Sequence, residues 1–85
     1  MNYTVTWEEA AETQLATLWL QATDKSAVAG YIDQMDRVLG RDPKGAGESR
    51  NETTRIAFFR PLVVRFHIDE TLKIVTVTAV RWVGH

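Results

Sequence analysis

The chain has 85 residues, of which 45% are hydrophobic and 25% are charged, and it contains no cysteine. A chain of this length builds one small core, so we expect a single domain over residues 1–85. The lack of cysteine excludes disulfides and thiolate metal sites, and two histidines alone do not make a zinc site; we expect no metal and no cofactor. No apolar run reaches the roughly 20 residues of a membrane span and the N-terminus lacks a secretory pattern, which predicts a cytoplasmic protein without membrane contact.

Charge is divided unevenly along the chain, although the net charge is only −1. Residues 1–36 carry six acidic side chains and one basic side chain, a net charge of −5. Residues 37–85 carry nine basic and five acidic side chains, a net charge of +4. Seven of the ten basic residues are arginine, whose guanidinium pairs phosphates and carboxylates through two hydrogen bonds. This asymmetry indicates that the second part of the chain binds something anionic.

A short strand and two helices account for the first half of the chain. Residues 3–7 alternate in polarity and predict a strand, and Thr6 with Glu9 forms a capping box that predicts a helix near 7–21. Thr23 or Asp24 can cap a second helix that ends near Gly40. Its apolar stripe is Val28, Ile32, Met35 and Leu39. The connection between the helices is short, so we expect an antiparallel helical hairpin.

A loop and three strands account for the second half. Residues 41–52 contain one proline, two glycines and almost no apolar side chain, which predicts a loop. Alternating apolar residues then predict strands around 54–58, 62–68 and 72–80, arranged as an antiparallel meander. The order β-α-α-β-β-β predicts an α+β fold, a two-layer domain in which the helical hairpin packs on a mainly antiparallel four-stranded sheet.

The side chains of the meander divide between two faces, because alternate residues of a strand point in opposite directions. The apolar set of strand 62–68 must face the helices, which leaves Arg65 and His67 on the open face. For strand 54–58 the same logic predicts that Ile56 and Phe58 point inward and that Arg55 points outward. The open face then carries Arg55, Arg65, His67 and Arg81, with Arg50 and Lys44 on the adjacent loop.

Arginine and histidine on one sheet face are what contacts to phosphates and bases require. An ordinary solvated sheet face shows the same pattern, and that alternative stays open. His67 by itself is also typical of a surface strand residue, and His85 is the last residue of the chain.

Several short motifs occur in a characteristic order along the chain. They are Tyr3-Thr4-Val5-Thr6-Trp7, Leu15-x-x-Leu18-Trp19, Val38-Leu39-x-x-Asp42-Pro43, Gly47-Glu48-Ser49-Arg50, Arg55 and Pro61-Leu62-Val63-Val64-x-Phe66-x-Ile68-Asp69. In this order and spacing they resemble the RelE/ParE superfamily of bacterial type II toxins, also called plasmid stabilisation proteins. The resemblance covers nearly the whole chain.

The resemblance implies a toxin that a cognate antitoxin protein holds inactive. It leaves two targets open, namely the ribosome with messenger RNA, which RelE-like members cleave, and DNA gyrase, which ParE-like members inhibit without cleavage. By strand position, Arg55, Arg65 and Arg81 match basic positions of the RNase members. Their phosphate contacts would accompany proton transfer, for which His67 is the candidate.

The resemblance therefore gives three catalytic candidates, Arg65, Arg81 and His67. Arg50, Arg55 and Lys44 are candidates for binding the nucleic acid or another target. RNase members tend to have more lysines on the second strand and a histidine or tyrosine at the end of the last strand, where this chain has Arg81-Trp82. A non-catalytic member that acts only as a protein-binding module is the alternative function.

Overall fold

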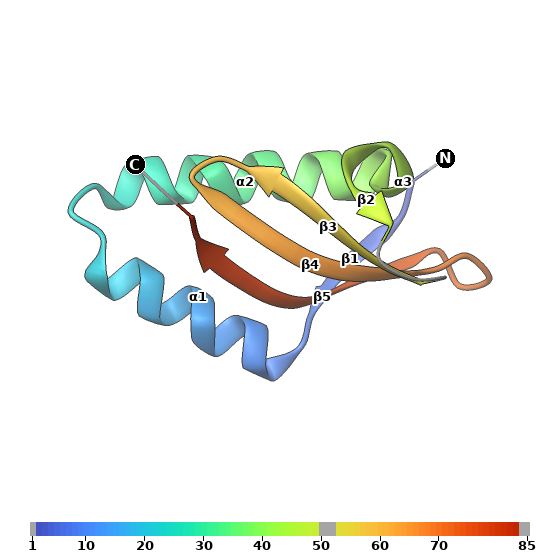
Figure 1. Cartoon of the computed structure of the whole chain (residues 1–85), viewed down its shortest axis with the longest axis horizontal. Helices are drawn as coiled ribbons and strands as arrows, with labels where there is room; N and C mark the ends of the chain where they lie inside the picture. The colour runs from blue at the N-terminus through green and yellow to red at the C-terminus, as the bar shows by residue number, and fades with distance from the viewer. Residues whose placement is uncertain (1, 50–52, 84–85) are drawn as a thin grey trace.

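The computed structural model describes residues 2–49 and 53–83 and shows helices packed on a five-stranded sheet (Figure 1). The α+β class is confirmed. In chain order the elements are β1 (Thr4–Trp7), α1 (Glu9–Gln21), α2 (Lys25–Arg41), α3 (Pro43–Ala46), β2 (Glu48–Ser49), β3 (Thr54–Phe59), β4 (Leu62–Asp69) and β5 (Ile74–Trp82). The sheet order is β1-β5-β4-β3-β2; β1 runs parallel to β5 and the other pairs are antiparallel.

The expected four strands and the order β-α-α-β-β-β are wrong, because α3 and β2 lie where we expected only a loop. The Asp42 carboxylate accepts a hydrogen bond from the backbone N–H of Gly45 at 3.1 Å, which closes the single turn of α3. A Cβ on Gly47 would lie 2.8 Å from the carbonyl oxygen of Ile56, so glycine allows β2 to approach β3. One helical turn and a two-residue strand are too short to produce a periodic pattern.

The capping box predicted at the start of α1 does not form. The Thr6 hydroxyl instead lies 3.5 Å from the carbonyl oxygen of Val75 and 3.3 Å from the hydroxyl of Thr76, across the β1–β5 pair. At α2 the predicted cap is present, since the Asp24 carboxylate accepts from the N–H of Ala27 at 3.0 Å. The predicted cap is therefore absent at α1, where the Thr6 side chain contacts β5 instead, and present at α2.

Helix α1 lies beside β5 rather than over the middle of the sheet (Figure 1). Within residues 2–49 and 53–83, β1 pairs with β5 only between Ile74 and Val77, and no other strand pairs with the next part of that edge. Gln14 of α1 fills this place, because its side-chain oxygen accepts from the backbone N–H of Val80 at 2.9 Å. The helix thereby covers a strand edge that would otherwise expose an unpaired donor.

The core lies between the helices and one face of the sheet. Met35 and Leu39 of α2 are fully buried there, whereas Ile32, which we expected in the core, is only partly buried. Leu15 and Leu18 are also partly buried and pack against the core cluster. The sheet contributes Ala57, Phe59, Leu62, Val64, Phe66, Ile68, Val75, Val77 and Val80. Among the described residues, no helix is long and apolar enough to cross a membrane.

Candidate functional site

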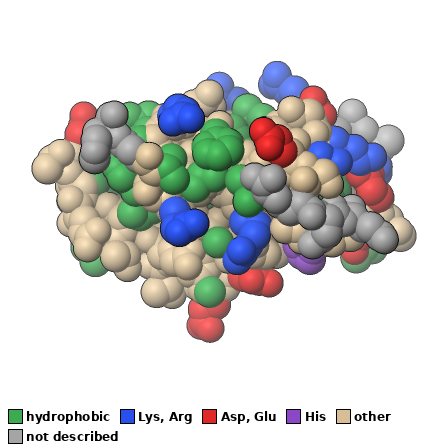
Figure 2. All heavy atoms as spheres, in the orientation of Figure 1, with side chains coloured by type: hydrophobic (Ala, Val, Ile, Leu, Met, Phe, Trp, Pro, Cys, Tyr) green, Lys and Arg blue, Asp and Glu red, His purple; other side chains and the backbone are tan. Residues whose placement is uncertain are grey.

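The face of the sheet opposite the helices carries two rows of side chains across β3, β4 and β5. Strand pairing places Phe58, Val63 and Arg81 in one row, and Ile56, Arg65 and Ala79 in the next. Directly opposite residues of neighbouring strands have Cβ atoms about 4.5–5.5 Å apart, so each row is continuous. Figure 2 shows the result as an apolar centre with Lys and Arg side chains around it.

Five residues of these rows, together with Val64, Val80 and Gln14 of α1, line a shallow hollow of about 410 Å³. Ile56, Val63 and Ala79 supply apolar surface, and the exposed side chains of Arg65 and Arg81 supply positive charge. The arrangement can hold an anionic group against the guanidinium groups while an apolar or planar group rests on the aliphatic surface. The prediction that Arg65 and Arg81 lie on the open face agrees with these positions.

A β-bulge next to Arg65 brings a hydroxyl group to its side chain. The pairing of β4 with β5 shifts between Arg65 and Phe66, and the shift leaves Thr78 as the extra residue on β5. The Thr78 hydroxyl accepts a hydrogen bond from the Arg65 Nε at 3.2 Å and donates one to the carbonyl oxygen of Arg65 at 3.2 Å. These bonds orient the guanidinium and leave its terminal nitrogens for a ligand. The sequence pattern gave no signal for the bulge, and Thr78 was missed.

His67 lies on the open face, as expected, but outside the hollow. It is exposed on β4, two residues beyond Arg65, and stands opposite Thr54 of β3 and Thr76 of β5. Two residues along a strand correspond to about 6.6 Å, so a ligand extended along β4 could contact both side chains. Its proposed role in proton transfer stays a prediction.

The predicted orientation of β3 is wrong. Ala57 and Phe59 point into the core, and Phe58 is 49% exposed on the open face beside Ile56. Because Phe58 and Phe59 are adjacent, an apolar inward face can be formed either by Ile56 and Phe58 or by Ala57 and Phe59. The small Ala57 side chain gave only a weak signal for the second arrangement, which is the one observed. The pairing of Ile56 with Arg65 and of Phe58 with Val63 decides the orientation.

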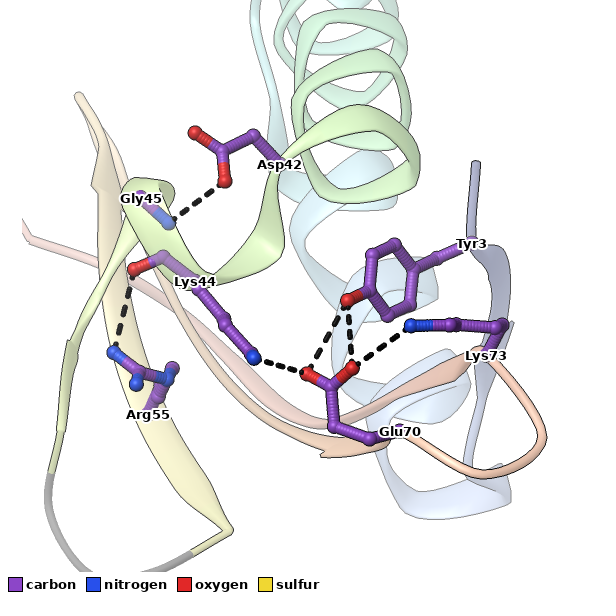
Figure 3. A network of polar contacts seen from close by, with 7 residues as sticks. All are labelled: Tyr3, Asp42, Lys44, Gly45, Arg55, Glu70 and Lys73. Atoms are coloured by element: carbon purple, nitrogen blue, oxygen red, sulfur yellow. Dashed lines mark hydrogen bonds and ion pairs between the residues drawn. The ribbon is translucent and has the colours of Figure 1, made fainter. Parts of the chain in front are cut away.

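Arg55 is consequently not on the open face. It stands opposite the buried Phe66, on the same side of the sheet, and its side chain is partly buried. Its Nη1 donates to the backbone carbonyl oxygen of Lys44 at 3.3 Å (Figure 3) and also to that of Gly47 at 3.3 Å. Lys44 belongs to α3 and Gly47 directly follows it, so Arg55 holds the α3–β2 segment in place and does not lie on the open face.

Lys44, the other described loop candidate, is engaged in a polar network (Figure 3). Its Nζ lies 2.9 Å from the Glu70 carboxylate, which also accepts from Lys73 at 3.1 Å and from the Tyr3 hydroxyl at 2.9 Å. Hydrogen bonds from Lys44, Lys73 and Tyr3 lower the pKa of Glu70 to about 2, and the Glu70 carboxylate raises the pKa of Lys73. The network joins the start of β1, α3 and the β4–β5 turn, which indicates a structural role for Lys44.

Two residues considered from the sequence, Arg50 and His85, lie outside the described residues. Within the part of the chain that the structure describes, no group of three or more His, Cys, Asp or Glu side chains could hold a metal ion. The candidate site therefore consists of the hollow with Arg65, Arg81 and Thr78, together with the neighbouring Phe58 and His67.

Comparison with solved structures identifies the architecture. The toxin–antitoxin complex RelBE2 from Mycobacterium tuberculosis contains a chain with a TM-score of 0.80 and 20% identity, over 96% of this chain and 99% of that one. The chain has the fold of the RelE and ParE toxins. The chromosomal ParDE system of P. aeruginosa matches with a TM-score of 0.73 and 16% identity, over 96% of this chain and 97% of that one.

An archaeal RelE–RelB complex from Pyrococcus horikoshii OT3 matches with a TM-score of 0.70 and 13% identity, over 100% of this chain and 99% of that one. No protein-family model and no curated protein sequence matches the chain. The resemblance drawn from the sequence motifs is thus confirmed at the level of the fold.

Proposed function

We propose that this protein is the toxin of a type II toxin–antitoxin pair and that a cognate antitoxin binds it. The supporting observation is the match to the RelBE2 structure over nearly the full length of both chains. Insertions or missing elements would have reduced this coverage. The open hollow with Arg65 and Arg81 supplies the surface on which such a toxin would act.

The first candidate activity is cleavage of messenger RNA on the ribosome. In this reaction the RNA 2′ oxygen bonds to the adjacent phosphorus, the bond from phosphorus to the 5′ oxygen breaks, the 2′ proton passes to a base, and the 5′ oxygen takes up a proton. Arg65 and Arg81 would hold the phosphate and stabilise the charge that develops on it. His67 is the candidate for moving the proton, because it lies on the same face along β4.

Inhibition of DNA gyrase is the second candidate activity. Among the described residues that line the hollow, only Arg65 and Arg81 are ionisable, and guanidinium binds anions without exchanging protons at neutral pH. This composition favours a surface that binds its target without cleaving it. The third candidate is a protein-binding module without toxicity, which the experiment must distinguish from the two toxin activities.

The test is expression of the full chain in bacteria under a tightly repressed promoter, comparing wild type, Arg65→Ala and Arg37→Ala. Arg37 is a matched control because it pairs with Asp33 on the surface of α2, away from the open face. We expect wild type and Arg37→Ala to arrest growth and Arg65→Ala to lose this effect. Folding of each variant is checked by circular dichroism.

The measurements that separate the activities are messenger RNA ends on translating ribosomes and supercoiling by purified gyrase. For an RNase, Arg65→Ala should slow cleavage by about 10²–10³-fold. Intact messenger RNA with inhibited supercoiling would support the gyrase activity. If wild-type protein arrests no growth, cuts no RNA and leaves gyrase active, the toxin proposal fails and the binding module takes its place.

A further inference from the structure

Phe58 has a position that neither a core role nor the hollow itself explains. It is one of the large hydrophobic side chains that the described structure leaves exposed, with 49% of its surface accessible. It stands on the open face directly opposite Val63, which in turn stands opposite Arg81. Phe58 therefore lies next to Val63, a residue that lines the hollow, on the β3 side, while Arg81 lines the hollow on the β5 side.

A cation lies over the same ring. The guanidinium carbon of Arg60 is 5.6 Å from the centre of the Phe58 ring, within the range of a cation–π contact. Arg60 is exposed and follows β3 directly, at the turn into β4. The guanidinium covers one face of the ring, so a base would stack on the other face, and Arg60 together with the two further arginines supplies charge for a phosphate backbone.

We propose that Phe58 is a stacking platform for an unpaired base of single-stranded RNA whose phosphates lie on Arg65 and Arg81. This inference rests on the proposed function and adds to it a residue that fixes where the RNA chain enters the hollow. The strand register supports the geometry, since Phe58 and Arg65 are diagonal neighbours on adjacent strands, about 7–8 Å apart. A nucleotide can therefore stack its base at one position while its phosphate meets the other.

The chemistry selects single strands over duplex RNA. A base inside a duplex has both faces covered by its neighbours, and the deep, narrow major groove of A-form RNA does not admit side chains. An unpaired base offers a free π-face, and stacking on it does not depend on which base is present. We therefore expect Phe58 to contribute affinity with little sequence preference, and Arg60, Arg65 and Arg81 to contribute the salt dependence.

The experiment measures the binding of the purified full chain to a fluorescent single-stranded oligoribonucleotide of about 8 nucleotides at low salt. The compared proteins are wild type, Phe58→Leu, Phe58→Trp and Arg65→Ala. Leucine keeps an apolar side chain over Val63 but has no π-face, whereas tryptophan keeps the π-face. We expect Phe58→Leu to weaken binding by about 5- to 150-fold and Phe58→Trp to retain it.

Two further probes separate stacking from charge. An abasic oligonucleotide of the same length should bind wild type and Phe58→Leu equally, because it offers phosphates without bases. Arg65→Ala should weaken the binding of both the base-bearing and the abasic strand. It should also reduce the slope of log affinity against log salt concentration by about the amount that one phosphate contact contributes. Duplex RNA should bind less tightly than the single strand.

Equal binding of Phe58→Leu and wild type to the base-bearing strand would overturn the platform, as would wild-type protein that does not bind the single strand at low salt. A Phe58→Leu variant that loses capture of a co-expressed antitoxin but not RNA binding would show that the ring serves a protein interface, which also contradicts the proposal. Growth arrest by wild type is measured separately, so the toxin function can stand when the platform fails.

Discussion

The hydroxyl of Thr78 makes two hydrogen bonds to Arg65, one from the Nε and one to the backbone carbonyl oxygen, both at 3.2 Å. The pair crosses from β5 to β4 at a bulge, where the regular pairing of the two strands shifts. An exposed arginine would otherwise sample many rotamers and lose entropy when it binds. The bulge thus orients one of the two arginines of the hollow before a ligand arrives.

Replacing Thr78 with valine should therefore weaken anion binding without unfolding the protein. Valine keeps the β-branched shape but removes both hydrogen bonds, of which only the one to the Nε orients the guanidinium. That bond is worth about 0.5–1.5 kcal/mol, so we expect a loss of roughly 2- to 13-fold in affinity for single-stranded RNA. Titration of the labelled strand measures it. Thr76→Val is the matched control on the same strand, because Thr76 contacts Thr6 and not Arg65. Identical losses in both variants would show that the Thr78 hydroxyl does not orient Arg65.

Arg55 should behave as a structural residue. Its Nη1 donates to the backbone carbonyls of Lys44 in α3 and of Gly47 directly after α3, and removing this donor leaves the partly buried Gly47 acceptor without this partner. We expect Arg55→Ala to lower the free energy of unfolding by about 1–3 kcal/mol, measured by urea denaturation, with little change in RNA affinity of the folded protein. Arg65→Ala should show the opposite pattern. A stable Arg55→Ala variant with lost RNA binding would return Arg55 to the target surface.

Glu70 should make the stability of the protein depend on acid pH. Its pKa is about 2 in the folded protein, below its usual 4.5, because Lys44, Lys73 and Tyr3 donate hydrogen bonds to it. A lowered folded pKa contributes stability that is present above about pH 4.5 and is lost as the pH falls toward about 2. In the Glu70→Gln variant, the urea concentration at the midpoint of unfolding should depend less on pH over this range. At neutral pH this midpoint should be lower than that of wild type.

The control for this experiment is Glu9→Gln, an exposed glutamate in the first turn of α1. It should leave the acid part of the stability curve close to that of wild type. If Glu70→Gln has the same acid dependence as wild type, other carboxylates govern the transition and the network is too solvent-exposed to matter.

Sequence patterns predicted best where long segments bury one face. The apolar stripe of α2 and the alternation of β4 extend over several residues that face one core, so each residue supports the same orientation. Arg65 and His67 were placed correctly on the open face for this reason. The order of short motifs also predicted the RelE/ParE fold, because the motifs mark element boundaries along nearly the whole chain.

By itself, then, the sequence determined the α+β class, the two main helices, the face of β4 and the RelE/ParE resemblance. Tertiary structure alone decided three features of the site: the inward face of β3, which exposes Phe58 and turns Arg55 toward α3; the bulge that brings Thr78 to Arg65; and the ion pair that engages Lys44. The physical reason is that each depends on a strand partner or a turn distant in sequence. Local periodicity reports which residues are apolar, but hydrogen-bond register between strands decides which of them meet.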